Sequence, residues 1–481
     1  MNNPRILSLY LGVLLVSLVS FVQSNVVVAE ELDMSFADAW TLVAAENDTL
    51  QAARADIESA VHKKDAAKDL YLPEISISAS YIYLDDDIEL SPSDVLDSMA
   101  AGDQLAPLVG GLAGSYGISA AQVEKGLTST INDRETLISS ISAKWPIYTG
   151  GRITAAQDIA AGQYREAAQN LQLKSLTQFE TLTRYYFGAV LANRVFETRK
   201  EVESGLKQHL DHAILLEEQG QIAKVERMQS QASHDKAVVE RKKAGRDLEI
   251  ARVALTLMLK KTETVIPSDA LFAKESLPEM KQLLERTLKV YPGLHLLDSK
   301  KDQVEGLVAV EKGKYYPTVG LFGNYSLYEE ESLATELAPD WVVGVGVSIP
   351  LIERDGRSGK LKAAQSTIRK IESLKSQARI DLSVLLEKTY RQAEQALEEY
   401  DGLGSSEMLA EETVDLRIKA FSQGLSTSLD VVDAELFLAG VKSQRALALF
   451  NHVVALAKLV AISGDLPSFF QYQISPQIEV R

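Results

Sequence analysis

Two stretches of the chain, YLPEISISASYIY at residues 71–83 and YYPTVGLFGNYSL at residues 315–327, follow one pattern 244 positions apart. Each begins with two apolar or aromatic residues and a proline, and then alternates apolar with polar or small residues. Strict alternation is typical of a β-strand with one apolar and one polar face. Its recurrence so far along the chain indicates a fold built from two copies of one structural repeat.

A second set of matches is separated by 204 positions. Gly220 corresponds to Gly424, and Glu226 corresponds to Asp430. The first copy must therefore hold an insertion, which we place at about residues 84–134. Each copy is predicted to run short helix, helix, strand, strand, very long helix and long return helix, so the fold class is mostly α with a small β part. The predicted divisions are a signal peptide at 1–29, a first repeat at 30–262, a connector at 263–277, a second repeat at 278–463 and a C-terminal tail at 464–481.

The N-terminal residues are typical of a secretory signal. Arg5 precedes an apolar core at residues 6–22, and Val27 and Ala29 supply the small residues of a cleavage site. A permanent N-terminal anchor is the alternative. Beyond this segment, the sequence shows no apolar run that we expect to cross a bilayer as a helix.

Two further segments, around residues 140–147 and 341–349, alternate in the same way. Each of the four segments has roughly the length that a tilted strand needs to cross a bilayer, and aromatic residues lie near their ends. A half-buried sheet in a soluble domain is the alternative. Four strands cannot close a barrel, and open edges in lipid would leave backbone groups unpaired. If these strands span a membrane, several chains must combine.

Proline is absent between Pro146 and Pro267 and between Pro350 and Pro467. Uninterrupted helices of roughly 65 residues, or roughly 100 Å, are therefore predicted in both stretches. The return helix after Leu429 keeps an apolar three–four spacing to Val460, which favours a left-handed coiled coil. The glycines of residues 401–405 interrupt the preceding helix and predict a break or kink there.

These features together resemble the TolC family of outer-membrane efflux proteins. The motif GLSTSLDVVDA at residues 424–434 is the most specific part, and WPIYTGGR at residues 145–152 marks a strand-to-helix exit. The helix–strand junction residues carried by the resemblance are Pro73, Pro146, Gly150, Gly151, Pro317 and Pro350.

The resemblance implies a homotrimer with a 12-stranded β-barrel in the outer membrane and an α-helical barrel in the periplasm. Its helix tips, at Gly220, Gly424 and Leu425, would dock a periplasmic adaptor protein and an inner-membrane pump. The chain would be the exit duct of a tripartite efflux or type I secretion system, with outer-membrane lipid as a further partner. A secreted coiled-coil scaffold of the cell envelope is the alternative.

In this family an acidic ring guards the periplasmic entrance. It maps to Asp430 and Asp433, with Glu226 as the partner acid of a latch that closes the entrance. Six crowded carboxylates would raise one another's pKa and attract cations. The alternative is that Asp430 only stabilises the N-terminus of a helix. The latch arginine and tyrosine are replaced here by Ser426 and Phe421, so the latch is either absent or rebuilt in this chain.

Other chemistry is not supported by the sequence. The chain has no cysteine and a net charge of −17, which disfavours a thiolate metal site and nucleic-acid binding. No nucleotide-binding or hydrolase motif is present, so we expect no enzyme activity, no cofactor and no metal. His209 and His212 lie three residues apart, and we expect both to be solvated. The insertion is predicted to be extracellular, with residues 107–117 either folding over the pore or forming a surface loop.

Overall fold

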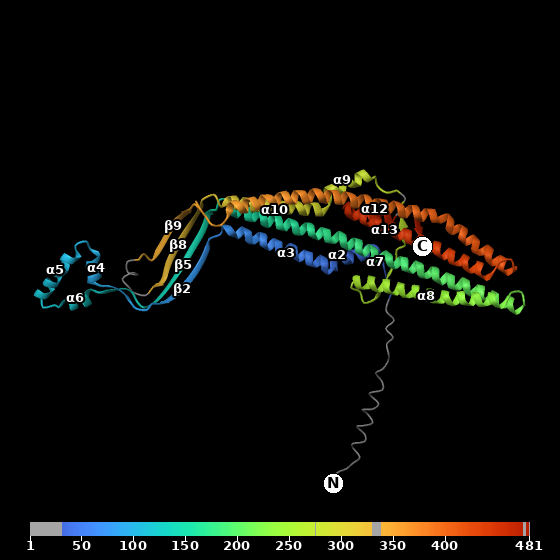
Figure 1. Cartoon of the computed structure of the whole chain (residues 1–481), viewed down its shortest axis with the longest axis horizontal. Helices are drawn as coiled ribbons and strands as arrows, with labels where there is room; N and C mark the ends of the chain where they lie inside the picture. Colours follow the sequence, from blue (N-terminus) through green and yellow to red (C-terminus); the bar gives the residue numbers. More distant parts are fainter. Residues whose placement is uncertain (1–30, 275, 330–337, 475–477, 481) are drawn as a thin grey trace, which may run out of the picture. The chain divides into compact units, whose positions relative to one another are not determined.

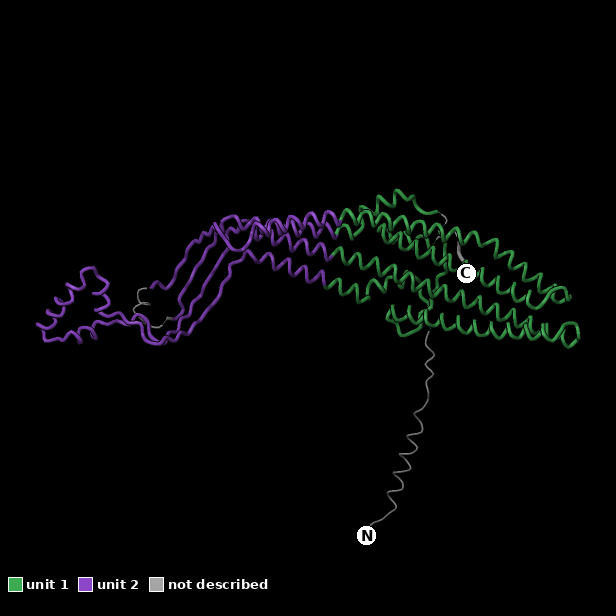
Figure 2. The backbone as a smooth tube through the Cα atoms, in the orientation of Figure 1, with its two compact units in different colours: residues 1–55, 168–295, 375–481 green, residues 56–167, 296–374 purple. Residues whose placement is uncertain are grey.

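The computed structural model describes residues 31–274, 276–329, 338–474 and 478–480. The predicted signal peptide, residues 1–29, lies outside the described residues. The chain divides into two compact units, shown in Figure 2. Unit 1 comprises residues 1–55, 168–295 and 375–481, and unit 2 comprises residues 56–167 and 296–374. Each unit therefore draws on both halves of the sequence, so the two repeats do not fold as two separate units.

The predicted strands form one antiparallel sheet in unit 2, with the order β2-β5-β8-β9 (Figure 1). Their bounds are β2 Glu74–Tyr83, β5 Glu135–Tyr148, β8 Thr318–Glu329 and β9 Trp341–Ser348. Ile77 pairs with Ile141, and Tyr325 pairs with both Ile141 and Trp341. Within the described residues, β2 and β9 each pair with a single strand, so both edges of the sheet carry unpaired backbone groups.

The apolar face of the sheet is exposed. Among the apolar residues of β2 and β9, those exposed to more than 60% are Ile75, Ile77, Tyr81, Trp341, Val343, Val345 and Val347. On the opposite face, Ser76 and Ser142 hydroxyls lie 2.9 Å apart across the strands, which gives that face a hydrogen-bonded polar lining. The alternative of a half-buried soluble sheet is therefore wrong, since no described residue covers the apolar face. Such a face is typical of strands that contact lipid.

The insertion folds as a short ribbon that carries three helices in unit 2 (Figure 1). Its elements are β3 Ile88–Leu90, α4 Pro92–Ser98, α5 Gly102–Ser115, α6 Ala120–Leu127 and β4 Ser129–Asn132. Ser91 and Ser119 begin α4 and α6 with capping boxes. Most of residues 107–117 therefore lies in a helix rather than in an irregular loop, and Leu108, Leu112 and Tyr116 remain exposed.

The helices follow the predicted order in both copies. The first copy has α2 Phe36–Glu46, α3 Asp48–Lys68, α7 Arg152–Glu218 and α8 Lys224–Met258; the second has α9 Met280–Val290, α10 Pro292–Gly313, α12 Arg357–Ser422 and α13 Ser428–Ile462. A 3-10 turn at Asp69–Tyr71 leads into β2, and α14 spans Leu466–Ile474. The helices α7 and α12 contain 67 and 66 residues, as the proline-free stretches predict.

Of the break or kink predicted at residues 401–405, the break is wrong, because α12 continues as one helix through these residues. Gly404 instead leaves room for Arg445 of α13, whose Nη2 would lie 3.3 Å from a Cβ at this position. The Arg445 guanidinium lies over the ring of Tyr400, and its Nη1 is 2.6 Å from a carboxylate oxygen of Glu407. The absence of a side chain at Gly404 therefore leaves the space that the Arg445 guanidinium occupies.

An aromatic core holds unit 1 together. Its largest fully buried side chains include Phe36, Phe179, Tyr186, Phe187, Phe272 and Phe469. Two small sheets, unpredicted from the sequence, lie in this unit: β1 Glu31–Met34 pairs with β6 Thr264–Pro267, and β7 Leu271–Ala273 pairs with β10 Ile478–Val480. The predicted connector, residues 263–277, therefore contains two strands of unit 1.

One helix differs from the expectation that no later segment is apolar enough to cross a bilayer. Among the described residues, α13 passes that test by length and composition, with a mean hydropathy of 1.6 in its most apolar window. However, 67% of that window is buried within this chain. Val432, Ala439 and Val453 of the predicted seam are buried, so α13 is a core helix.

Candidate functional site

The two helical hairpins of unit 1 turn in the same way. Gly220 and Gly424 both have φ +72°, in the left-handed region that favours glycine. In the first turn, Gln221 N–H donates to Leu216 O at 2.8 Å; in the second, Leu425 N–H donates to Ala420 O at 2.9 Å. These bonds are those of a Schellman motif, which ends a helix at a glycine. The two predicted tips therefore share one backbone geometry, 204 residues apart.

Asp430 closes a capping box at the start of α13. Its Oδ2 accepts hydrogen bonds from Thr427 N–H at 2.9 Å and from Thr427 Oγ1 at 2.7 Å. Ser426 Oγ donates to the same oxygen, and Arg417 Nη1 lies 3.6 Å from Oδ1. Hydrogen bonds from Thr427, followed by those from Ser426, lower the pKa of Asp430 below its ordinary value. The side chain thus has the capping geometry that the alternative interpretation requires.

Asp433 lies one turn further along α13 and is exposed. It borders a cavity of about 210 Å³ between α7, α8 and α13. Arg199 and Lys236 line this cavity together with apolar side chains that include Val202 and Val432. Asp433 is free of the capping role of Asp430, since its side chain lies beyond the capping box. The two aspartates therefore have different surroundings within one chain.

Glu226 joins the two hairpins. Its Oε2 accepts a hydrogen bond from Ser428 N–H at 2.8 Å, so a residue of α8 caps the first turn of α13. Of the two replaced latch positions, Phe421 packs its ring edge-on against His209 at 4.5 Å, and Ser426 donates to Asp430. The residues at the two predicted latch positions therefore contact a histidine of α7 and the capping aspartate of α13.

His209 is buried, which contradicts the expectation that it is solvated. Only 5% of the residue is exposed, whereas its neighbour His212 is exposed. His209 Nε2 lies 2.8 Å from Ser428 Oγ, and Ser428 Oγ lies 2.7 Å from Ser230 Oγ. Burial, together with the nearby His212, lowers the pKa of His209 to about 4. The imidazole is therefore neutral at neutral pH.

No group of three or more His, Asp or Glu side chains that could hold a metal ion occurs in the part of the chain that the structure describes. His209 has a hydroxyl partner, Ser428, on α13 and an aromatic partner, Phe421, on α12. The pair of histidines predicted to be solvated is thus split, one buried in a polar cluster and one in solvent.

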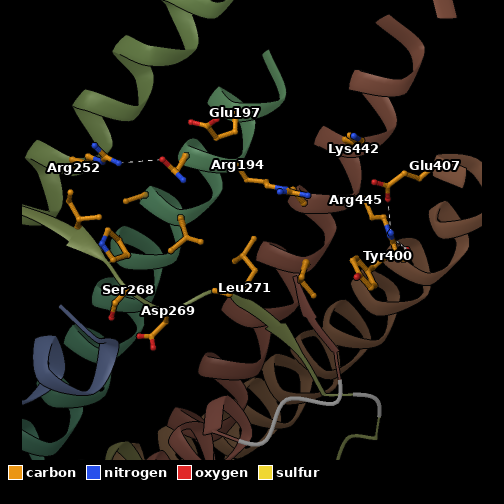
Figure 3. A pocket seen from close by; sticks show the side chains of 18 residues that line it. Arg194, Glu197, Arg252, Ser268, Asp269, Leu271, Tyr400, Glu407, Lys442 and Arg445 are labelled. Carbon is orange, nitrogen blue, oxygen red and sulfur yellow. Dashed lines mark hydrogen bonds and ion pairs between the residues drawn. The ribbon is translucent and has the colours of Figure 1, made fainter. Parts of the chain in front are cut away.

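A larger cavity, of about 650 Å³, lies elsewhere in unit 1 and is lined from α7, α8, α12 and α13 (Figure 3). Arg252 donates to Asn193 Oδ1, and Arg445 reaches Glu407, as Figure 3 shows. Lys442 pairs with Glu201 and Glu411. The Arg252 and Arg445 contacts each join the two helices of one hairpin, whereas the pair of Lys442 with Glu201 joins α13 to α7 and so connects the two hairpins.

The junction residues lie in unit 2, where the helices meet the sheet. Gly150 and Gly151 have φ +66° and +80°. A Cβ at Gly150 would lie 2.4 Å from Gly313 O, so only glycine allows this approach of two backbones. Pro73 and Pro317 directly precede β2 and β8, and Pro350 follows β9.

Pro146 was predicted at the exit from a strand, but it lies inside β5. It occupies an irregularity in the pairing of β5 with β8. The pairing of β5 with β2 ends at Lys144. A proline is tolerated there because the irregular pairing does not require the backbone N–H that proline lacks.

Sequence reasoning missed Ser230 and Ser428. Their hydroxyls matter only because α8 and α13 bring them together 198 residues apart in the chain. Ser428 follows Ser426 and Thr427 in a polar stretch, so no local signal distinguished it.

The comparisons with known proteins agree with this geometry. The family model for outer membrane efflux proteins matches residues 41–259 and 283–465, one range for each repeat. The chain belongs to the outer membrane efflux protein family. This TolC-like membership makes it an outer-membrane channel that acts in efflux, with a large helical periplasmic part. No curated protein sequence matches the chain.

Solved structures share the fold at low identity. The channel CusC is 12% identical with a TM-score of 0.71, covering 90% of this chain and 92% of that one. CmeC of Campylobacter jejuni is 13% identical with a TM-score of 0.68, covering 90% and 86%. MtrE of Neisseria gonorrhoeae, solved in an open state, is 18% identical with a TM-score of 0.65, covering 90% and 89%.

Proposed function

We propose that three copies of this chain form one exit duct, through which substrates pass passively from the periplasm to the outside. The observation that carries this proposal is the four-stranded sheet with two unpaired edges and an exposed apolar face. Edges in lipid cost several kcal/mol for each unpaired backbone group, so the sheet needs neighbours. Three sheets joined from β9 of one copy to β2 of the next make a closed antiparallel barrel of twelve strands.

The experiment is reconstitution of the mature protein. Detergent-purified protein should have the mass of a trimer and should give discrete conductance steps in a planar lipid bilayer. Val345→Lys places a charge on the lipid-facing side at a cost of about 2–4 kcal/mol, and should prevent assembly. Ser80→Lys, on the polar face, is the control and should still assemble. A water-soluble monomer that leaves the bilayer silent would refute the proposal.

At the periplasmic end, we propose that Asp430 and Asp433 of three chains surround the entrance and favour cations. Asp430 keeps its capping role in this arrangement, because its Oδ2 accepts the capping bonds while Oδ1 faces Arg417. Asp430→Asn combined with Asp433→Asn should reduce cation selectivity in single-channel recordings. Asp235→Asn, an exposed acid on α8, is the matched control. Equal selectivity in all three proteins would contradict the ring.

The tips are proposed to dock a periplasmic adaptor protein, which links the duct to an inner-membrane pump. Leu425 is 77% exposed beside the turn glycine, and Val225 is 62% exposed near the other tip. Apolar side chains this exposed fit a partner surface. Leu425→Glu should abolish adaptor binding in a pull-down while bilayer conductance persists. The energy for transport comes from the pump, and we propose no catalytic activity for this chain.

A further inference from the structure

The buried cluster around Ser428 connects three helices of unit 1. His209 comes from α7, Ser230 from α8 and Ser428 from the first residue of α13. Ser428 is fully buried, and Ser230 is 1% exposed. Such a cluster is costly unless each donor finds an acceptor, because buried polar groups left unpaired cost about 1–3 kcal/mol each.

Counting donors fixes the direction of the hydrogen bonds. Ser230 Oγ donates to Glu226 O at 3.0 Å, which uses its only hydrogen. The 2.7 Å contact between the two serines then requires Ser428 to donate to Ser230. Ser428 can accept only from His209, so Nε2 carries a hydrogen and donates at 2.8 Å. The result is a one-way chain from α7 through α13 to α8.

A second bond reinforces this chain. Ser428 N–H donates to Glu226 Oε2, so both the backbone and the side chain of Ser428 are held by the first hairpin. Phe421 of α12 covers the imidazole edge-on. All four helices that meet at the two tips thus contribute to one cluster.

We propose that the His209–Ser428–Ser230 chain is an acid-labile tie that holds the second helical hairpin onto the first at the tip. Protonation of His209 would leave a buried positive charge beside Phe421 and Ser428, and no carboxylate of the described residues forms an ion pair with its ring. Two titratable groups act on this cluster: His212 on α7 acts on His209 by repulsion, and Glu226 on α8 accepts from Ser428 N–H. Asp430 on α13 is occupied as a helix cap and lies 3.6 Å from Arg417 of α12, so both charges are engaged with partners outside the cluster.

The direction of the pH effect follows from the pKa of His209, lowered from 6.5 to about 4. A released tip binds a proton on His209 more readily than a closed tip does. The contribution of the tie is therefore complete above pH 6.5 and is lost as the pH falls toward 4.

The tie is tested by hydrogen exchange on the detergent-purified full-length protein, followed in peptides that cover residues 424–436. After correction for the intrinsic rate, exchange should be roughly 10- to 30-fold faster at pH 5.0 than at pH 7.5. His209→Ala should exchange rapidly at both pH values. His209→Gln keeps an amide donor for Ser428 but does not titrate, so it should stay protected at both.

His212→Gln, the exposed neighbour, is the matched control and should behave like the unmodified protein. Equal corrected exchange at both pH values, or a His209→Gln protein that remains acid-sensitive, would overturn the tie. If His209→Ala fails to assemble, the comparison between His209→Gln and the unmodified protein still decides.

If the chain forms the proposed duct, release of the tie would open its periplasmic entrance, and this consequence rests on the proposed function. Conductance measured on the same proteins separates the two ideas. Acid-sensitive exchange with no bilayer conductance would support the tie and contradict the duct, whereas conductance with acid-insensitive exchange would support the duct and contradict the tie.

Discussion

The two hairpin tips share a turn but differ in how the following helix begins. At the second tip, Thr427 and Asp430 form a capping box that satisfies the start of α13 locally. At the first tip the corresponding N-cap is Ala223, which provides no side-chain cap for α8. Glu226, the counterpart of Asp430, is consequently free to reach Ser428 on the other hairpin. The repeat without a local cap thus has a carboxylate available for contact with the other repeat.

The largest loss of stability is expected at Ser428, where the helical hairpins of the two repeats meet. Ser428→Ala removes the acceptor of His209 and the donor to Ser230, both buried. The local free energy of opening should fall by about 1–3 kcal/mol, measured by hydrogen exchange across residues 424–436. Ser443→Ala is the control, because Ser443 donates only to Ala439 O within its own helix. Equal effects of the two substitutions would show that the shared hydroxyl contributes nothing.

The next largest loss of stability tests whether the two hairpin turns have the same backbone geometry. Gly220→Ala and Gly424→Ala each place a Cβ in the left-handed region, with no heavy atom within 4 Å of it. The cost is then purely conformational, about 1–2 kcal/mol, and should be the same at both tips. Denaturant titrations or local exchange rates of the two variants measure it. A clearly larger free-energy cost at one tip would mean that the two turns do not share one backbone conformation.

A smaller effect distinguishes the capped helix from the uncapped one. Thr427→Ala should destabilise the start of α13 by about 1 kcal/mol, because it removes the acceptor of Asp430 N–H. Amide exchange in the first turn of α13 reports it. The same measurement on Thr413→Ala, whose hydroxyl donates to Leu409 O within α12, provides the control. Unchanged amide exchange in Thr427→Ala would mean that Glu226 alone caps the first turn of α13.

The smallest net effect is expected from repairing the first copy. Ala223→Thr builds a Thr-x-x-Glu capping box with Glu226, which should stabilise α8 by about 0.5 kcal/mol or more. The repaired box competes with Ser428 for the same carboxylate, so the two changes should nearly cancel in overall stability. Exchange should slow in the first turn of α8 and quicken at the start of α13. Slower exchange at both places would argue against competition.

The sequence predicted the repeat, the four strands and the long helices because these depend on periodicities that neighbouring residues express together. The proline-free stretches predicted α7 and α12 closely, and alternation predicted each strand of the sheet. It failed at residues 401–405, where glycine suggested a break. Gly404 packs against the guanidinium of Arg445, 41 residues away, and no local sequence pattern predicts that contact.

Within the candidate site, the sequence determined the turn glycines and the acids, since the repeated motif places the glycines after helix ends and Glu226 and Asp430 in the first turn of the next helix. It did not reveal that His209 is buried or that Ser230 and Ser428 share a hydrogen bond. Those facts depend on which faces of α7, α8 and α13 meet, and side-chain burial is a property of that packing. Local sequence therefore fixed the elements and their ends, whereas only the tertiary structure decided which polar groups leave water together and must satisfy one another.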